Sequence, residues 1–206
     1  MRCDYAPMEG ITNYLCRNAH HRYFGGVDRY FMPFVSPCKD HVFAKRELRD
    51  IIPEHNEGVP VVPQLLTRVP EDFLWAAKEL KAMGYREVNL NLGCPSGTVV
   101  AKGKGSGLLA SAEELDRFLD AIFSGTDLIL SVKTRLGLRQ EEEFGPPLEV
   151  YNRYPIACLT IHPRVQKDFY RGAVRMEAFR AALAMSRNPV CYNGDLVTAE
   201  ECRELE

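Results

Sequence analysis

The sequence predicts an α/β fold, specifically a TIM-type (β/α)8 barrel that lacks its last β/α repeat. Short β-rich runs, most of them nearly continuous in apolar residues, alternate with amphipathic helical stretches. That alternation is typical of parallel strands covered by helices. Polar side chains recur where the runs end, and in such barrels the carboxyl ends of the strands carry the active site. We expect seven strands, at residues 3–8, 29–34, 59–65, 87–92, 128–133, 157–162 and 189–193.

Start and stop signals frame the helices between these runs. Pro70 suits a first helical position, and Gly84 ends the apolar stripe that follows it. Ser111 with Glu114 has the spacing of a capping box, and Thr198 opens a last helix in the same way. Because (β/α)8 barrels typically run to about 250 residues, we expect one incomplete domain over residues 1–206.

Composition and charge narrow the class of protein. The 206 residues are 46% hydrophobic and 26% charged, as in ordinary globular proteins. No apolar run approaches the roughly 20 residues of a membrane span, and no signal peptide opens the chain, so we expect a cytoplasmic protein without membrane contact. The net charge of −2 argues against a basic nucleic-acid scaffold but allows an RNA-modifying enzyme with a local basic patch. The seven scattered cysteines argue against disulfides and metal sites, and we expect most of them to be buried.

Polar residues close five of the predicted strands. They are Gln64, Asn91, Cys94, Lys133, His162, Asn193 and Asp195. Any one of them alone is more often a satisfied hydrogen-bonding group, but in this fold the strand ends converge on one mouth. Lysine is almost never fully buried unless it is paired, so Lys133 indicates an anionic partner.

A flavin mononucleotide (FMN) meets these requirements. Lys133 can stabilise the anionic reduced ring, and Gln64 offers the pyrimidine edge both a donor and an acceptor. The sequence contains neither a G-x-G-x-x-G nor a P-loop pattern, which disfavours a Rossmann-type dinucleotide fold.

Cys94 stands between Gly93 and Pro95, which favour a loop directly after a strand. A thiol with an ordinary pKa near 8.5 is protonated at neutral pH and can donate a proton. The local sequence leaves a second interpretation open, a structural cysteine in a tight turn. The following residues 96–107 contain Lys102, Lys104 and several glycines but no acidic residue, which indicates a mobile, basic and exposed lid.

A third cluster follows the predicted strand at residues 157–162. Its polar members are His162, Arg164, Gln166, Lys167, Tyr170 and Arg171. Five cations of the two loops can form a phosphate-facing rim around the mouth, namely Lys102, Lys104, Arg164, Lys167 and Arg171. A solvated charged loop is the alternative for Lys167 and Arg171, because surface lysine and arginine need no special explanation.

In combination, these elements resemble the tRNA-dihydrouridine synthase family over nearly the whole chain. The Asn-x-Gly-Cys-Pro element, followed by Lys-x-Arg-x-Gly and Asn-Gly-Asp, is highly specific as a set. The matching segments are residues 6–12 (APMEGIT), 63–65 (PQL), 89–95 (NLNLGCP), 102–109, 133–137 (KTRLG), 162–166, 170–172 (YRG) and 193–195 (NGD).

The resemblance implies an FMN enzyme that uses NADPH to reduce particular uridines of tRNA to 5,6-dihydrouridine. Hydride then passes to uracil C6, and Cys94 is the implied acid that protonates C5. Asn91, Lys102 and Arg164 are implied to bind the substrate. The implied FMN contacts are Pro7, Met8, Gln64, Lys133, His162, Asn193, Gly194 and Asp195. We also expect a monomer.

The sequence departs from the family pattern in two ways. Pro163 stands where many relatives have Gly or Ala, which stiffens that loop. Family members continue into an eighth strand with a phosphate-binding element and then a C-terminal helical domain that binds tRNA, and we expect both to be missing here. Two other functions stay open. One is an FMN-dependent barrel oxidoreductase acting on a small pyrimidine, which the basic rim disfavours, and the other is an inactive barrel fragment.

Overall fold

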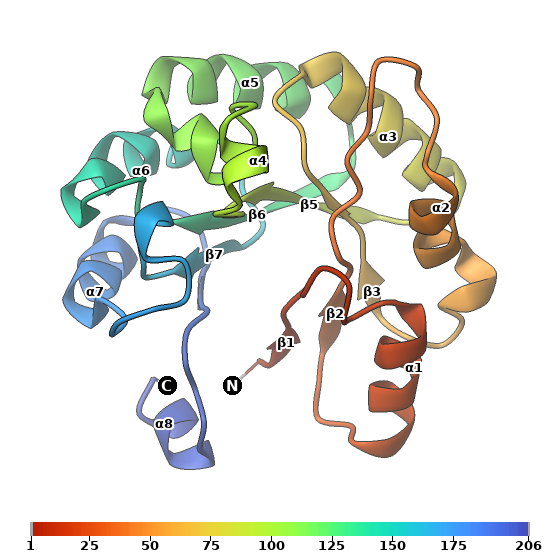
Figure 1. Ribbon diagram of the computed structural model, residues 1–206, viewed down its shortest axis with the longest axis horizontal. Helices are drawn as coiled ribbons and strands as arrows, with labels where there is room; N and C mark the ends of the chain where they lie inside the picture. The colour runs from red at the N-terminus through yellow and green to blue at the C-terminus, as the bar shows by residue number, and fades with distance from the viewer. Residues whose placement is uncertain (1, 206) are drawn as a thin grey trace.

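The computed structural model describes residues 2–205, and its helices lie outside the parallel strands (Figure 1). Strand and helix alternate along the chain, which confirms the predicted α/β class. The strands are β1 (Asp4–Tyr5), β2 (Arg29–Phe31), β3 (Val61–Val62), β4 (Gln64–Leu65), β5 (Glu87–Leu92), β6 (Ile129–Arg135), β7 (Leu159–His162) and β8 (Val190–Tyr192). The α-helices are α1 (Tyr14–Tyr23), α2 (Lys45–Ile51), α3 (Pro70–Ala82), α4 (Gly97–Val100), α5 (Ala112–Gly125), α6 (Gly145–Tyr151), α7 (Met176–Met185) and α8 (Ala199–Arg203). The 3-10 helices are η1 (Pro53–His55), η2 (Gly105–Ala110), η3 (Glu141–Phe144) and η4 (Gln166–Asp168).

All strand pairs are parallel, in the orders β1-β2-β3 and β4-β5-β6-β7-β8. The strand predicted at residues 59–65 is divided at Pro63 into β3, which pairs with β2, and β4, which pairs with β5. Proline has no N–H to donate, so the ladder is interrupted there. A bridge between Val35 and Leu65 keeps the two sheets in contact.

The predicted barrel is not closed in the part of the chain that the structure describes. No ladder joins β1 to β8 among residues 2–205. Instead, Asp4 and Ala6 line a cavity of about 30 Å³ together with Cys191 and Tyr192, whereas strands pair only when their backbones lie about 4.8 Å apart. The structure is therefore an arc of parallel strands with β1 and β8 as its edges.

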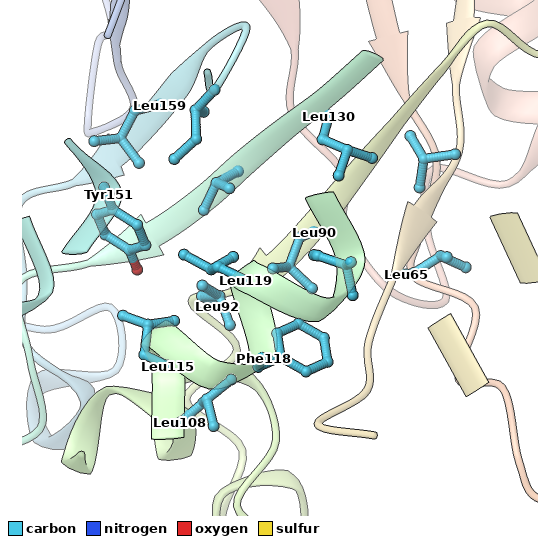
Figure 2. Packing of buried hydrophobic residues seen from close by; sticks show 14 of the residues in the cluster. Leu65, Leu90, Leu92, Leu108, Leu115, Phe118, Leu119, Leu130, Tyr151 and Leu159 are labelled. Atoms are coloured by element: carbon cyan, nitrogen blue, oxygen red, sulfur yellow. The ribbon is translucent and has the colours of Figure 1, made fainter. Parts of the chain in front are cut away.

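The main hydrophobic core lies between the strands and the outer helices. Leu90 and Leu92 of β5 pack beside Leu115, Phe118 and Leu119 of α5 (Figure 2). These side chains are at most 3% exposed, and burying each of them stabilises the fold by roughly 1.5–3 kcal/mol. The alternate residues of β5 point to the opposite face of the strand, which leaves that face free to carry polar groups.

Three of the predicted helix starts are confirmed. Pro70 is the first residue of α3. Ser111 Oγ accepts a hydrogen bond from the N–H of Glu114 (3.2 Å) at the start of α5, and Thr198 forms a capping box with Glu201 at the start of α8. These contacts pair N–H groups that the first turn of a helix leaves without partners. They therefore set the first residues of α5 and α8.

The cysteines differ from expectation in their exposure. All seven are free, but only Cys158 is buried, Cys38 is exposed and the others are partly exposed. The prediction that most of them are buried is therefore wrong. The reason is visible for Cys94 and Cys191, which line cavities rather than packed core.

The described residues form no membrane-spanning helix. Within residues 2–205, no helix is both long enough and apolar enough to cross a bilayer.

Candidate active site

A cavity of about 720 Å³ opens at the carboxyl ends of the strands. Its lining includes residues from the ends of β1, β4, β5, β6, β7 and β8, so the strand ends converge as the fold predicts. Ten residues singled out from the sequence line it: Pro7, Met8, Gln64, Asn91, Cys94, Lys133, His162, Asn193, Gly194 and Asp195. The roles assigned to them stay predictions.

Two residues predicted to bind substrate, Lys102 and Arg164, do not line the cavity. Lys102 is exposed in the turn after α4. Arg164 is 1% exposed and forms an ion pair with the carboxylate of Asp195. Its Nε also donates to the carbonyl oxygen of Gly172 (3.1 Å). Arg164 is therefore not part of an exposed phosphate-facing rim, because its guanidinium is buried and already paired.

Cys94 sits in a turn that a side chain of β5 holds in place. Asn91 Oδ1 accepts hydrogen bonds from the N–H groups of Gly93 (3.1 Å) and Cys94 (2.9 Å). The carbonyl oxygen of Cys94 accepts from Ser106 Oγ (2.9 Å). Burial raises the pKa of the Cys94 thiol, which keeps the proton on the sulfur at neutral pH. The turn therefore presents a protonated thiol to the cavity.

The segment at residues 96–107 packs against this turn rather than standing away from it as an open lid. It folds into α4 and the start of η2, and Gly105 and Ser106 are buried. Lys104 Nζ donates to Ser36 Oγ (3.2 Å), which ties the segment to the loop after β2. The predicted exposure of this lid is therefore wrong for most of the segment, although Lys102 is exposed as expected, and the mobility of the segment stays a prediction.

The cavity contains a lysine, Lys133, that has no hydrogen-bond partner among the residues that the structure describes. Within residues 2–205, Lys133 Nζ makes no hydrogen bond or ion pair, and burial with the nearby Arg135 guanidinium lowers its pKa to about 8. Binding of an anionic or electron-rich ligand would stabilise the charged form of this lysine.

His162 is held neutral beside this lysine. Burial, together with Arg135, Lys133 and Arg164, lowers its pKa to about 3. His162 Nε2 accepts from Arg164 Nη1 (3.2 Å), because a guanidinium can only donate, so the imidazole proton is on Nδ1. The histidine is therefore neutral and not a cation at the cavity wall.

Sequence reasoning missed Arg135 and two aromatic residues of the cavity lining, Phe34 and Phe169, although it singled out Tyr170. Arg135 Nε donates to the carbonyl oxygen of Gly93 (2.8 Å) and its Nη1 to that of Phe169 (2.6 Å). Its guanidinium also lies 5.1 Å from the ring centre of Tyr170. Strand periodicity could have found Arg135, because it follows Lys133 by two residues on β6. Phe34 of the cavity carries no polar signal and could not have been found this way.

Fold and site together define a class of protein. Parallel strands that end at a cofactor-sized cavity lined by a thiol, cations and side-chain amides are the arrangement of an α/β enzyme. The family model of the dihydrouridine synthases matches residues 4–205. The chain therefore belongs to the dihydrouridine synthase family.

Individual relatives agree with this assignment. The chain is 28% identical over 205 residues to a probable tRNA-dihydrouridine synthase of Rhodobacter capsulatus, covering 96% of this chain and 61% of that protein. It is 32% identical over 208 residues to one of Staphylococcus epidermidis, covering 97% of this chain and 63% of that protein. With probable tRNA-dihydrouridine synthase 1 of Synechocystis sp. it is 27% identical over 199 residues, covering 95% of this chain and 54% of that protein. The chain thus spans less than two thirds of these relatives' lengths.

Proposed function

We propose that this chain carries the catalytic site of a tRNA-dihydrouridine synthase, which uses FMN and NADPH to reduce particular tRNA uridines to 5,6-dihydrouridine in the cytoplasm. The observation that carries the proposal is one cavity lined by Cys94, Lys133, His162 and the side-chain amides of Gln64 and Asn91. Membership of the family supports the class of reaction, and the names of the relatives supply tRNA as the substrate.

The donors and acceptors of the cavity fit FMN. The volume of about 720 Å³ lies within the roughly 300–1,000 Å³ of small-molecule and cofactor sites. An electron-rich ring gives Lys133 the partner that it lacks within residues 2–205. Gln64 uses one N–H and one oxygen lone pair inside the protein, so one donor and one acceptor remain for a pyrimidine edge. When bound, FMN supplies the hydride that reduction of uracil requires.

The other FMN contacts that we propose follow the same cavity wall. His162 contributes a neutral imidazole to the cavity wall, because its Nε2 is already occupied by Arg164. The remaining proposed contacts are Pro7, Met8, Asn193, Gly194 and Asp195, which all line the cavity.

Cys94 is the acid of the proposed reaction. Burial raises the pKa of its thiol, so at neutral pH the sulfur carries the proton that an acid delivers. Transfer of that proton to uracil C5 leaves a thiolate, and the positive charges of Arg135 and Lys133 stabilise it. Asn91 keeps the turn in place through the N–H groups of Gly93 and Cys94.

Exposed groups on the loops that line the cavity suit an RNA substrate. Lys102, Lys167 and Arg171 are all exposed in the loops that follow β5 and β7, where they can contact phosphates. Tyr170 is 71% exposed, and an aromatic ring in such a place can stack on a base. A uridine has to leave its stack to enter the cavity. Because Arg164 is buried against Asp195, we assign it to the loop and not to direct contact with RNA.

The test is the protein with Cys94 replaced by Ala, loaded with FMN and supplied with NADPH and unmodified tRNA. We expect Cys94→Ala to bind FMN like the unsubstituted protein and to form little dihydrouridine, measured by mass spectrometry of the tRNA nucleosides. Cys202→Ala, which changes a cysteine of α8 outside the cavity, is the matched control and should leave the yield unchanged. Normal yield from Cys94→Ala would remove Cys94 from the mechanism.

The same preparation separates the rival functions. Reduction of free uracil or orotate without any response to tRNA would favour an oxidoreductase for small pyrimidines. A colourless protein that aggregates and binds no FMN would favour an inactive fragment, since strands β1 and β8 leave open edges.

A further inference from the structure

A row of buried polar side chains runs along the inner face of β5, below the cavity. Gln64 Nε2 donates to Asn89 Oδ1 (2.7 Å), and Asn89 Nδ2 donates to Ser131 Oγ (3.0 Å). Ser131 Oγ in turn donates to Glu87 Oε1 (2.7 Å). Gln64, Asn89 and Ser131 are all 0% exposed. Buried polar groups of this kind are unfavourable unless they are fully paired, so the row needs an explanation.

The lower end of the row is an ion-pair cluster that joins the two sheets. Arg29 of β2 donates to both carboxylate oxygens of Glu87 (2.8 Å each) and to Asp4 Oδ2 of β1 (2.6 Å). Glu87 is therefore an ionised acceptor with fixed partners. It receives hydrogen bonds from Arg29 and Ser131 and donates none.

The upper end of the row is fixed by backbone groups. Asn91 Oδ1 accepts from the N–H groups of Gly93 and Cys94, so the other half of the Asn91 amide, Nδ2, has to donate. It donates to Gln64 Oε1 (2.7 Å). The backbone groups at the upper end and the carboxylate of Glu87 at the lower end allow only one pattern of donors and acceptors in the row. Each hydrogen bond between Asn91 and Glu87 is therefore donated toward Glu87.

The consequence is that the Gln64 amide cannot turn over. A flip would place its NH2 against the Asn91 NH2 and its oxygen against Asn89 Oδ1. Each of these buried groups would lose its partner, which strongly disfavours the flipped orientation. The free N–H and the free lone pair of Gln64 therefore keep fixed places at the floor of the cavity.

We propose that Asn89 and Ser131 are positioning residues, which lock the orientation of the Gln64 amide and so set the donor and acceptor that the cavity offers to a bound ring. Neither residue touches the cavity of the active site, and both act through Gln64. The inference rests on the proposed function where it identifies the ring as that of FMN. The ligand class that fits the locked amide is any ring edge with one acceptor beside one donor.

The test compares three variants in the otherwise unchanged protein. Asn89→Ala removes the acceptor of Gln64 Nε2, and Ser131→Ala removes the next link. Thr134→Val is the matched control, because Thr134 is another buried hydroxyl of β6 whose bonds are to Tyr151 and the Arg135 carbonyl oxygen and not to the row. We expect FMN to bind to Asn89→Ala at least roughly fivefold more weakly than to the unsubstituted protein. The loss of FMN affinity should be smaller for Ser131→Ala, and Thr134→Val should bind FMN within about twofold of normal.

A second measurement follows Gln64 directly and needs no cofactor. In the unsubstituted protein, side-chain NH2 protons of Gln64 and Asn89 should exchange slowly with solvent by NMR. Gln64 should exchange faster in Asn89→Ala and Ser131→Ala but not in Thr134→Val. Rapid exchange of Gln64 in the unsubstituted protein, or equal behaviour of all three variants, would overturn the proposal. A protein that shows the slow exchange yet binds no FMN would instead contradict the proposed function and leave the positioning role standing.

Discussion

The backbone of Gly105 lies directly against Cys94. A Cβ atom at position 105 would be 2.9 Å from the carbonyl oxygen of Cys94 and 3.0 Å from its Cβ, and the φ angle of Gly105 is +57°. Glycine is therefore required twice, once for space and once for a left-handed backbone. This contact brings η2 over the turn that carries the thiol and explains why residues 96–107 are not an open lid.

We predict that Gly105→Ala displaces the Cys94 turn. The positive φ angle and the close contact together should lower the free energy of unfolding by about 1–3 kcal/mol. Formation of dihydrouridine should fall further than FMN binding, since the thiol moves while the cofactor contacts remain. Gly58→Ala is the control, because Gly58 has a φ angle of +74° with open space around it. Equal losses of activity in the two variants would show that the contact with Cys94 has no role.

Arg135→Lys should destabilise the protein although it keeps the charge. Arg135 spans the carbonyl oxygens of Gly93 and Phe169, and the single ammonium of lysine cannot reach both in the same geometry. We expect the free energy of unfolding to fall by about 2–3 kcal/mol, measured by urea denaturation. Arg139→Lys, in the exposed loop after β6, should change it by less than about 0.5 kcal/mol. Identical stability of both variants would contradict the bridging role.

The sequence predicted which residues meet in the cavity wherever their position is set by the end of a strand. The polar residues after the predicted strands meet in one cavity because parallel strands bring their carboxyl ends to one side. The near-continuous apolar runs were a poorer guide to β5, whose residues alternate between polar and apolar. Glu87, Asn89 and Asn91 share the inner face, and Val88, Leu90 and Leu92 alternate with them and belong to the hydrophobic core. The alternation in the sequence could therefore have predicted the row of polar side chains below the cavity.

The surroundings of the other site residues depend on contacts between residues that are far apart in the chain, which a single sequence does not reveal. Arg164 looked like a rim cation because its neighbours are polar, but its guanidinium pairs with Asp195, which lies 31 residues away along the chain. Residues 96–107 looked mobile because of their glycines, whereas Gly105 uses its small size to approach Cys94. In both cases the deciding partner is distant in sequence or is a backbone atom.

Lys133 should make stability depend on pH when no ligand is bound. Its pKa is lowered to about 8 in the folded protein, against about 10.4 in an unfolded chain. Between these values the unfolded state binds more protons, so the contribution of Lys133 to stability rises with pH across this window. Relative to Lys133→Met, the free energy of unfolding should gain at most about 3 kcal/mol between pH 8 and pH 10.5.

Urea denaturation of both proteins at several pH values measures this difference. Subtracting the Lys133→Met curve removes the contributions of tyrosines and cysteines, whose side chains titrate in the same pH range. Parallel curves would show that Lys133 already has a partner in the protein. Addition of FMN should flatten the difference, because an electron-rich ring favours the charged lysine.

Asp195→Asn tests whether Asp195 serves the protein fold as well as the cavity. The hydrogen bonds and charge of Arg164 lower the pKa of Asp195, so the ion pair contributes stability above the unfolded pKa of the carboxyl, about 3.9, and loses it as pH falls through the folded value. At pH 7 without flavin we expect Asp195→Asn to lower the free energy of unfolding by about 0.5–1.5 kcal/mol, because the buried Arg164 keeps its charge without a charged partner while solvent screens the exposed side of the pair. Glu200→Gln, which breaks an exposed pair with Arg203 on α8, should change it by less than about 0.5 kcal/mol. If Asp195→Asn is as stable as the unsubstituted protein and loses only FMN affinity, Asp195 acts on the cofactor alone and the loop is held by other contacts.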